Sequence, residues 1–427
     1  MSTSIIFVIL LVLMLTGMPI SISLGLTVLS FLFLFTQVPL ESVALKLFTG
    51  IEKFEIMAIP FFILAGNFLT HGGVARRMIR FATDMVGHWH GGLGLAGVMA
   101  CALFAAVSGS SPATVVAIGS ILLPAMVKAG YPNRYGAGVI TTSGALGILI
   151  PPSIVMVMYS VATNTSVGAL FMAGVLPGLA LASVLGGVTW YRARKYDYPR
   201  MPRATFGARW KSFRESIWGL LLIVVVMGGI YTGIFTPTEA AAMSAVYAFF
   251  VAVFVYKDMS LKDVPKVLLN SANMSAMLLY IITNAVLFSF IMTNENIPHA
   301  LADWLLGNGL GMVAFLLAVN VILLVAGNFM EPSSIVLIFA PILFPVAMKL
   351  GIDPVHFGII MVVNMEVGMC HPPVGLNLYV ASGITKMGIT DLTIAVWPWL
   401  LSMLGFLAVV TYWPGLSIWL PKALGMM

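Results

Sequence analysis

Helix-breaking residues recur in two hydrophobic stretches of this chain at a constant offset of 221 residues. The matched pairs are Pro124 and Pro345, Gly130 and Gly351, Gly147 and Gly368, Pro151 and Pro372, Pro152 and Pro373, and Pro177 and Pro398. Unrelated hydrophobic segments share Leu and Val freely, but they do not share Gly and Pro at fixed positions. The pattern therefore predicts an internal duplication, in which two copies of one unit carry the same interruptions.

The apolar runs that carry these breakers are long enough to cross a bilayer. Hydrophobic residues make up 60% of the 427-residue chain and charged residues only 8%, which excludes a soluble globular domain. Residues 5–35, 217–235 and 240–256 are examples, and they lack the period of two that a β-barrel strand requires. The first run has neither a basic segment before it nor a small-residue cleavage site. We therefore expect it to be a span of the mature protein rather than a signal peptide.

Each copy is expected to contain five spans and one re-entrant hairpin. The first copy has spans at 4–17, 19–36, 54–70, 134–163 and 167–191 with its hairpin at 93–130, and the second has spans at 216–235, 237–256, 268–293, 354–384 and 390–413 with its hairpin at 305–350. An odd number of spans places the second copy upside down relative to the first. The sequence thus predicts an all-α polytopic membrane protein with two inverted-topology repeats, each with a re-entrant hairpin and a broken helix.

The distribution of basic residues supports this topology. If the basic loop at 192–215 is cytoplasmic, 17 of the 21 Lys and Arg residues lie on that side, and only Lys46, Lys53, Lys349 and Lys422 lie opposite. Cytoplasmic loops of membrane proteins carry such an excess of Lys and Arg. We therefore expect both termini in the periplasm, and we assign the positive charge to membrane orientation rather than to nucleic-acid binding.

Four interruptions of the apolar pattern are candidates for a functional site. Two are hairpin tips, at 108–112 and 327–334, and two are helix breaks at double prolines, at 144–153 and 368–375. Irregular backbone at membrane depth is tolerated only inside protein or beside a polar cavity. Proline leaves carbonyls free to bind a cation, while half-helix N-termini present amides to an anion. These hard oxygen ligands suit sodium and a carboxylate better than a transition metal.

Individual polar residues in these segments also have structural interpretations. Ser143 and Asn364 could form hydrogen bonds between helices. Glu331 could cap a half-helix and Glu366 could pair with a buried donor, although an ionisable group inside a span usually has a function. His371 could contact a substrate or a proton, or it could simply pack. Only two cysteines, Cys101 and Cys370, are present, and we expect both to be packing residues.

The motifs around these interruptions resemble the large membrane subunit of tripartite ATP-independent periplasmic (TRAP) transporters. The resemblance rests on residues 108–120 and 144–153, Glu331-Pro-Ser-Ser, Asn364-Met-Glu and Pro372-Pro-Val-Gly-Leu-Asn377, and it covers essentially the whole chain. The amino-acid sequences of these motifs most resemble those of the C4-dicarboxylate branch. The resemblance implies an elevator-type secondary transporter of the ion-transporter superfamily kind, driven by sodium as coupling ion and without other cofactors. It also implies two partners, a small four-helix membrane subunit and a periplasmic solute-binding protein.

The same resemblance implies a division into a static scaffold and a mobile transport domain. The scaffold comprises 1–92 and 216–303, the basic cytoplasmic loop is 192–215, and the two transport halves are 93–191 and 304–427. The hairpins at 93–130 and 305–350 and the broken helices at 134–163 and 354–384 belong to the transport halves.

Site residues are also carried over from the resemblance. One sodium ion would lie between the first tip and the first break, with Ser108, Gly109, Ser110, Gly144 and Gly147 as ligands, and a second would lie among Asn328, Glu331, Gly368 and Met369. The substrate would lie between the tips, near Ser110, Ser111, Ser143, Asn328 and Asn364. None of these residues is Lys or Arg, so sodium and helix dipoles would balance a dianion.

The sequence pattern also allows other kinds of transporter, but it opposes proteases, ATPases and channels. A stand-alone sodium/carboxylate symporter, or a TRAP permease for sialic acid or a compatible solute, would share the scaffold. The chain lacks the motifs of intramembrane proteases and the Gly-x-x-x-x-Gly-Lys loop of an ATPase. A channel would need a continuous pore, which two closed tips oppose. We therefore expect a non-enzymatic transporter of the bacterial inner membrane, with succinate, malate or fumarate as its substrate.

Overall fold

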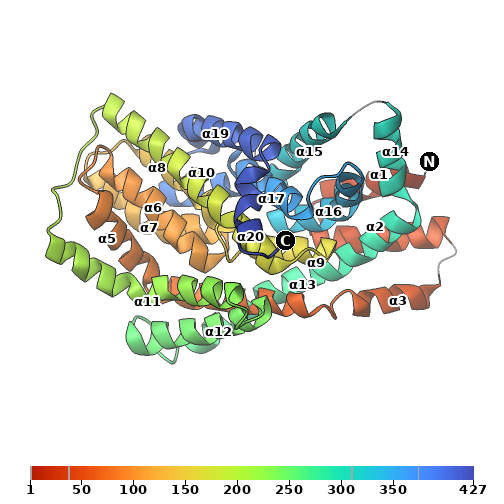
Figure 1. Ribbon diagram of the computed structural model, residues 1–427, viewed down its shortest axis with the longest axis horizontal. Helices are drawn as coiled ribbons and strands as arrows, with labels where there is room; N and C mark the ends of the chain where they lie inside the picture. The colour runs from red at the N-terminus through yellow and green to blue at the C-terminus, as the bar shows by residue number, and fades with distance from the viewer. Residues whose placement is uncertain (1, 37–38, 309–310, 374) are drawn as a thin grey trace.

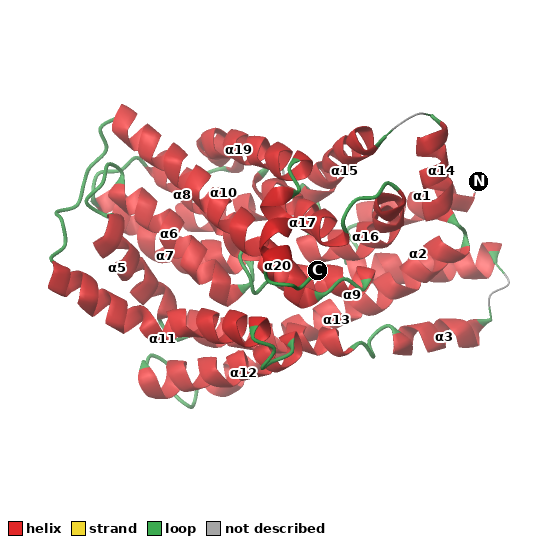
Figure 2. Cartoon of the chain, viewed as in Figure 1, coloured by secondary structure: helices red, strands yellow, loops and turns green. Residues whose placement is uncertain are grey.

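The structure is a computed structural model that describes residues 2–36, 39–308, 311–373 and 375–427. Within these ranges every regular element is a helix (Figure 2). The helices form one elongated bundle, with the N-terminus at one end and the C-terminus near the middle (Figure 1). The all-α fold class expected from the apolar runs is confirmed.

The first repeat begins with short helices and continues into a hairpin and a broken helix. Its elements are α1 (Ser2–Leu15), α2 (Ile20–Phe35), α3 (Leu40–Thr49), η1 (Phe54–Met57), α4 (Ala58–His71), α5 (Val74–Val86), α6 (Gly92–Ser108), α7 (Ser111–Lys128), α8 (Asn133–Gly144), η2 (Ala145–Ile148), α9 (Ile154–Thr163) and α10 (Val167–Lys195). Helices α6 and α7 form the first hairpin, and α8, η2 and α9 form the first broken helix.

The second repeat has the same order. Its elements are α11 (Phe206–Tyr231), α12 (Pro237–Phe250), the π-helical turn η3 (Val251–Val255), α13 (Val264–Asn294), α14 (Ile297–Gly307), α15 (Met312–Gly327), α16 (Pro332–Lys349), α17 (Pro354–Cys370), α18 (Leu376–Thr385), α19 (Ile389–Tyr412) and α20 (Gly415–Ala423). Helices α15 and α16 form the second hairpin, and α17 and α18 form the second broken helix.

The repeats differ most where the scaffold was predicted. The 31-residue helix α13 is continuous, whereas its counterpart in the first repeat is divided into α3 and α4 with η1 between them. The sequence analysis predicted neither α3, α5, α14 nor α20, because these helices are short or amphipathic. Helix α5, for example, carries three arginines and buries only its Val74, Met78 and Ile79 face.

Two predicted segments need their boundaries revised. Helix α10 continues to Lys195 and α11 begins at Phe206, so the predicted basic loop 192–215 is helical at both ends. Basic residues in the last turn of α10 interact favourably with its C-terminal carbonyls, which explains the extension. The predicted hairpin 305–350 and broken helix 354–384 contain residues 309–310 and 374, which lie outside the described residues, as do residues 1 and 37–38 of the predicted scaffold.

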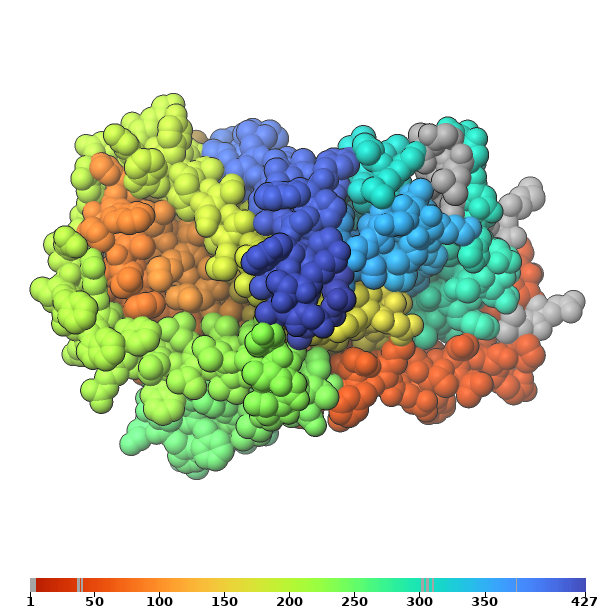
Figure 3. Space-filling view, viewed as in Figure 1, coloured from red at the N-terminus to blue at the C-terminus, as the bar shows by residue number. Residues whose placement is uncertain are grey.

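Eight of the described helical segments are long and apolar enough to cross a membrane. Several others, including α6, α9, α15 and α17, are apolar but shorter, because tips and breaks interrupt them. Helices α3, α11 and α12 lie along one long edge of the molecule, α19 lies along the opposite edge, and α17 lies near its centre (Figure 1). The space-filling view shows the α19–α20 region seated between the two ends of the bundle (Figure 3).

Trp399 on α19 of the second repeat packs against α8 and α10 of the first repeat. Its side chain is fully buried, and its Nε1 donates a hydrogen bond to Thr189 Oγ1 on α10 at 2.9 Å. The ring also packs against Tyr135 of α8, with centroids 5.7 Å apart. A Cβ atom on Gly138 would lie 2.5 Å from the Trp399 ring, so the indole fits against bare backbone.

We expect Trp399→Ala to destabilise the protein strongly, because removing a buried Trp from a packed core costs about 3–5 kcal/mol. The measurement is thermal unfolding of the purified chain in detergent. Trp397→Ala is the matched control, since Trp397 lies on the same helix and is 47% exposed. Equal melting temperatures for the two variants would contradict this packing.

Candidate functional site

The first hairpin tip, Ser108 to Ser110, is closed by hydroxyl groups. Gly109 has a φ of +59°, a left-handed conformation that favours glycine. The Ser108 Oγ lies 2.9 Å from Thr114 Oγ1, and Thr114 donates to the Ser110 carbonyl at 2.8 Å. Thr114, which sequence analysis did not single out, therefore fixes the shape of the tip.

The first helix break lies directly against this tip. Helix α8 ends at Gly144 and a 3-10 turn follows to Ile148 before the double proline. Ser111 Oγ donates to the Gly144 carbonyl at 2.9 Å. A Cβ atom on Gly147 would lie 2.6 Å from the carbonyl carbon and oxygen of Ser110, so only glycine permits this backbone approach.

The fold thus brings together all five residues expected to bind the first sodium ion. They are Ser108, Gly109, Ser110, Gly144 and Gly147, and the tip adds Ser111 from the expected substrate set. The oxygen atoms gathered here are hydroxyls and backbone carbonyls, which are the hard ligands that an alkali cation requires.

The second tip repeats this approach of tip and break. A Cβ atom on Gly327 would lie 2.9 Å from Gly368 Cα, so α15 and α17 touch through backbone. Asn328 is buried, and its Oδ1 lies 3.1 Å from His371 Nδ1, a donor in the second break. Gly375 has a φ of +43° and allows the chain to turn from the break into α18.

Glu331 occupies the N-cap position of α16. Its side chain accepts a hydrogen bond from Ser333 Oγ at 2.7 Å, but it makes no capping bond to a backbone amide. Among the described residues, Ser333 donates to only one of the two carboxylate oxygens, and Glu331 lies on the same tip as Asn328. Met369, also expected at the second sodium, is fully buried on the last turn of α17.

Asn377 connects the two repeats. Its Nδ2 donates to Ser111 Oγ at 2.7 Å, which links α18 of the second repeat to the tip of the first. Because Ser111 also bonds the Gly144 carbonyl, one chain of contacts runs from the second break through the first tip to the first break. Asn377 is the last residue of the Pro-Pro-Val-Gly-Leu-Asn motif, so the motif could have indicated it as a site residue.

Asn364, expected to contact substrate, is held by hydrogen bonds within the second repeat. Its Nδ2 donates to the Asn320 carbonyl at 3.0 Å and to Asn320 Oδ1 at 2.9 Å. Asn320 in turn donates to Thr411 Oγ1 at 2.9 Å. The amide nitrogen of Asn364 is therefore used structurally, while its Oδ1 is buried without a partner.

Buried polar atoms without a hydrogen-bond partner concentrate around the breaks. Among the described residues, six of nine such side-chain atoms lie there: Ser143 Oγ, Ser334 Oγ, Asn364 Oδ1, Asn377 Oδ1 and both Glu366 carboxylate oxygens. The backbone of Leu149 lies near Glu366 without forming a hydrogen bond of normal geometry. Unpaired buried polar groups are costly and uncommon. Their concentration makes this region the candidate site, where a bound ligand would supply the missing hydrogen bonds.

A small cavity lies between the predicted scaffold and the predicted transport halves. Its volume is about 220 Å³, and its lining includes Lys46, Lys53, Val161, Ala285 and Pro341. Lys53 Nζ donates to the Val161 carbonyl at 2.5 Å and to Asn164 Oδ1 at 2.8 Å, at the C-terminal end of α9.

Sequence analysis treated Lys46 and Lys53 only as charges on the less basic side. Burial lowers the pKa of Lys53, and the neighbouring Glu55 partly opposes this shift. The partial negative charge at the end of α9 favours the charged amine as well. The Lys53 amine therefore bridges the gap between the two predicted domains.

Comparison with known proteins is consistent with a transporter. Residues 7–416 match the family model described as tripartite ATP-independent periplasmic transporter, DctM component. The chain is 75% identical, over 100% of both chains, to the C4-dicarboxylate TRAP transporter large permease protein DctM of Rhodobacter capsulatus. It is 56% identical to the protein of the same name from Pseudomonas aeruginosa, over 95% of each chain. The solved YdaH transporter of Alcanivorax borkumensis has a similar fold, with a TM-score of 0.66, 16% identity and 90% coverage of each chain.

We expect Gly147→Ala to lower the melting temperature of the purified chain. The new Cβ would meet the backbone of Ser110 and Ser111, which cannot move aside as a flexible side chain does. Such overpacking costs about 1–3 kcal/mol. Gly187→Ala on α10 is the control, because nothing lies within 4 Å of its added Cβ. Equal melting temperatures for the two variants would contradict the close contact between tip and break.

Proposed function

Because this chain belongs to the DctM family of tripartite ATP-independent periplasmic transporters, we propose that it carries a C4-dicarboxylate across the inner membrane, coupled to sodium. The observation that carries the proposal is the pairing of each hairpin tip with one helix break, linked across the repeats by Asn377 and Ser111. The high identity to a relative named for C4-dicarboxylates supports the substrate class.

Two sodium ions would neutralise the substrate. The first would bind among Ser108, Gly109, Ser110, Gly144 and Gly147, where hydroxyls and carbonyls gather at close backbone contacts. The second would bind at Asn328, Glu331, Gly368 and Met369, with the Glu331 carboxylate contributing charge. Sodium supplies positive charge that no Lys or Arg of these two sets provides.

The substrate would lie between the tips. Ser110 is the N-cap of α7 and Glu331 is the N-cap of α16, so two half-helix N-termini begin there. Their amides and positive dipole ends favour an anion. Ser110, Ser111, Ser143, Asn328 and Asn364 would provide hydroxyl and amide contacts to the two carboxylates, and Ser143 Oγ and Asn364 Oδ1 are unpartnered.

The two hairpins and broken helices would move as one body against the scaffold. Hydrogen bonds such as those from Asn377, Asn364 and Trp399 link the elements of this body internally. A periplasmic solute-binding protein would deliver the substrate, and a small membrane subunit would brace the scaffold. The net movement is uptake, because sodium binds from the side where it is concentrated.

The direct test is uptake of radiolabelled succinate into proteoliposomes that contain this chain with its small membrane subunit. We expect uptake only when the binding protein and an inward sodium gradient are both present, and background uptake when potassium replaces sodium. Uptake without the binding protein would favour a conventional symporter. Sialic acid uptake without succinate uptake would keep the mechanism and change the substrate.

The hydrogen bonds from Lys53 to the end of α9 would form in only one position of the mobile body. We expect Lys53→Met to shift the equilibrium away from the conformation that contains this contact by roughly 10- to 150-fold, because hydrogen bonds involving a charged group contribute about 1.5–3 kcal/mol. The readout is the distance distribution between spin labels at Leu45 on α3 and Leu179 on α10, which are 62% and 56% exposed.

Lys46→Met is the control for Lys53→Met. Lys46 lines the same cavity, but its amine lies over the Phe290 ring of α13, on the scaffold side, at 5.2 Å. Its removal should leave the distance distribution nearly unchanged. Unchanged distances in the Lys53 variant would mean that this contact does not bias the mobile body.

A further inference from the structure

A second polar pocket lies far from the helix breaks, at the charged end of α11. Its volume is about 410 Å³, and it is lined by Arg77 of α5, by Lys211, Arg214, Glu215 and Trp218 of α11, and by Val255 and Tyr256 at the end of η3. Three basic residues and one acidic residue therefore face this pocket. It belongs to the outer face of the scaffold rather than to the expected transport site.

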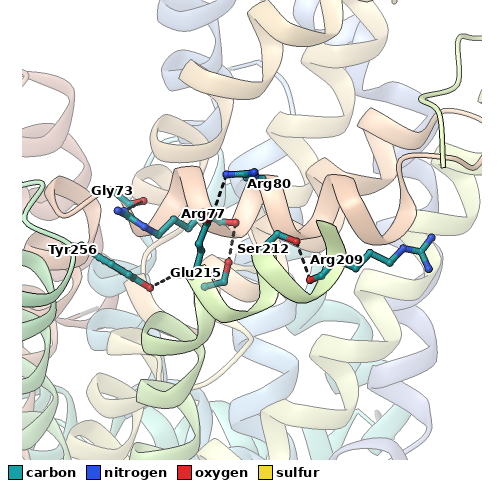
Figure 4. A network of polar contacts seen from close by, with 8 residues as sticks. Gly73, Arg77, Arg80, Arg209, Ser212, Glu215 and Tyr256 are labelled. Carbon is teal, nitrogen blue, oxygen red and sulfur yellow. Dashed lines mark hydrogen bonds and ion pairs between the residues drawn. The ribbon is translucent and has the colours of Figure 1, made fainter. Parts of the chain in front are cut away.

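The floor of this pocket is held in place by a network of polar contacts (Figure 4). The Arg77 guanidinium lies over the Tyr256 ring, 3.7 Å from its centroid, and forms an ion pair with Asp258. Tyr256 donates its hydroxyl to the Glu215 carbonyl at 2.7 Å, and Arg80 pairs with the Glu215 carboxylate at 2.9 Å. The charges of Arg77, Arg80, Asp258 and Glu215 are thus largely balanced.

Lys211 and Arg214 remain as the uncompensated charges. Neither forms an ion pair among the residues that the structure describes. They lie one helical turn apart on α11, at positions i and i+3, and both line the pocket. The pocket therefore offers two free cations over a rigid base.

The pocket lies where the polar and apolar parts of the scaffold meet. The charged segment of α11 ends at Glu215, and the apolar run begins at Ile217. Trp218 at this boundary is 42% exposed, as expected for an aromatic residue at the level of lipid headgroups. Beyond it, α11 exposes Leu221 and Val224, and η3 exposes Phe254. An apolar surface thus continues from the pocket into the bilayer.

We propose that this pocket binds the phosphate headgroup of an anionic phospholipid, with the acyl chains lying along the exposed apolar side chains of α11 and η3. Lys and Arg are the usual donors to phosphate oxygens, and basic pockets between membrane helices are known to hold anionic headgroups. The site is independent of the proposed transport function, because none of its residues contacts a tip or a break in the described structure.

The test is native mass spectrometry of the full chain, purified in detergent and incubated with phosphatidylglycerol or phosphatidylcholine. We expect preferential retention of phosphatidylglycerol. The double variant K211Q/R214Q should reduce that retention roughly 25-fold, because each of the two basic residues near a membrane surface contributes about fivefold to anionic lipid binding. The charge-matched control K262Q/K266Q, exposed and outside the pocket, should reduce it by less than twofold.

Four results would overturn the proposal. One is equal retention of the two lipids, and another is unchanged phosphatidylglycerol retention in K211Q/R214Q with an unaltered melting temperature. The third is loss of the bound lipid when the small membrane subunit is co-purified, which would make the pocket a subunit contact. Inorganic phosphate at millimolar concentration should not displace the lipid, because the apolar contacts add to the headgroup interaction; complete displacement would assign the pocket to a soluble anion.

Discussion

Backbone amides and carbonyls must be satisfied inside the protein wherever lipid surrounds it, and this constraint organises the structure. Both hairpin tips and both helix breaks interrupt helical hydrogen bonding. Each tip lies against one break, with Gly147 against Ser110 and Gly327 against Gly368. Glycine is required because a side chain would separate the two irregular segments. The resulting contacts bring the polar groups of each tip close to those of its break, with Ser and Thr hydroxyls at the first tip and Asn328, Glu331 and His371 at the second tip and break.

The charges of the molecule are distributed in three distinct ways. The tips and breaks contain hydroxyl and carbonyl oxygen atoms and the half-buried carboxyl group of Glu331, with the fully buried Glu366 just before the second break, but no Lys or Arg. The proposed anionic ligand would therefore need cations from solution. One lysine, Lys53, joins the segment between α3 and η1 to the end of α9, and this contact would break in the proposed movement. Lys211 and Arg214 lie at the lipid boundary of α11. Positive side chains are therefore absent from the tips and breaks, and they lie instead at the contact with α9 and at the charged end of α11.

Local chemistry explains why much of this architecture was readable from the sequence. Proline removes an amide, and glycine permits left-handed backbone, so residues 108–112, 144–153, 327–334 and 368–375 were identified as tips and breaks without knowledge of their neighbours. Amphipathic helices were harder to predict. Helix α5 carries three arginines in a short segment, and its single buried face depends on contact with α6 and α11. The segment has no apolar run that would identify it as part of a membrane protein.

The sequence by itself determined the duplicated order of elements, the helical class and the positions of the irregular segments, because each follows from local hydropathy and from Gly and Pro. Only the tertiary structure decided which polar atoms meet. Asn377 reaches Ser111 across 266 residues of sequence, Asn364 is already held by Asn320, and Thr114 closes the first tip. Hydrogen bonds depend on positions within a few tenths of an ångström, and those positions arise from the packing of helices that are distant in the chain.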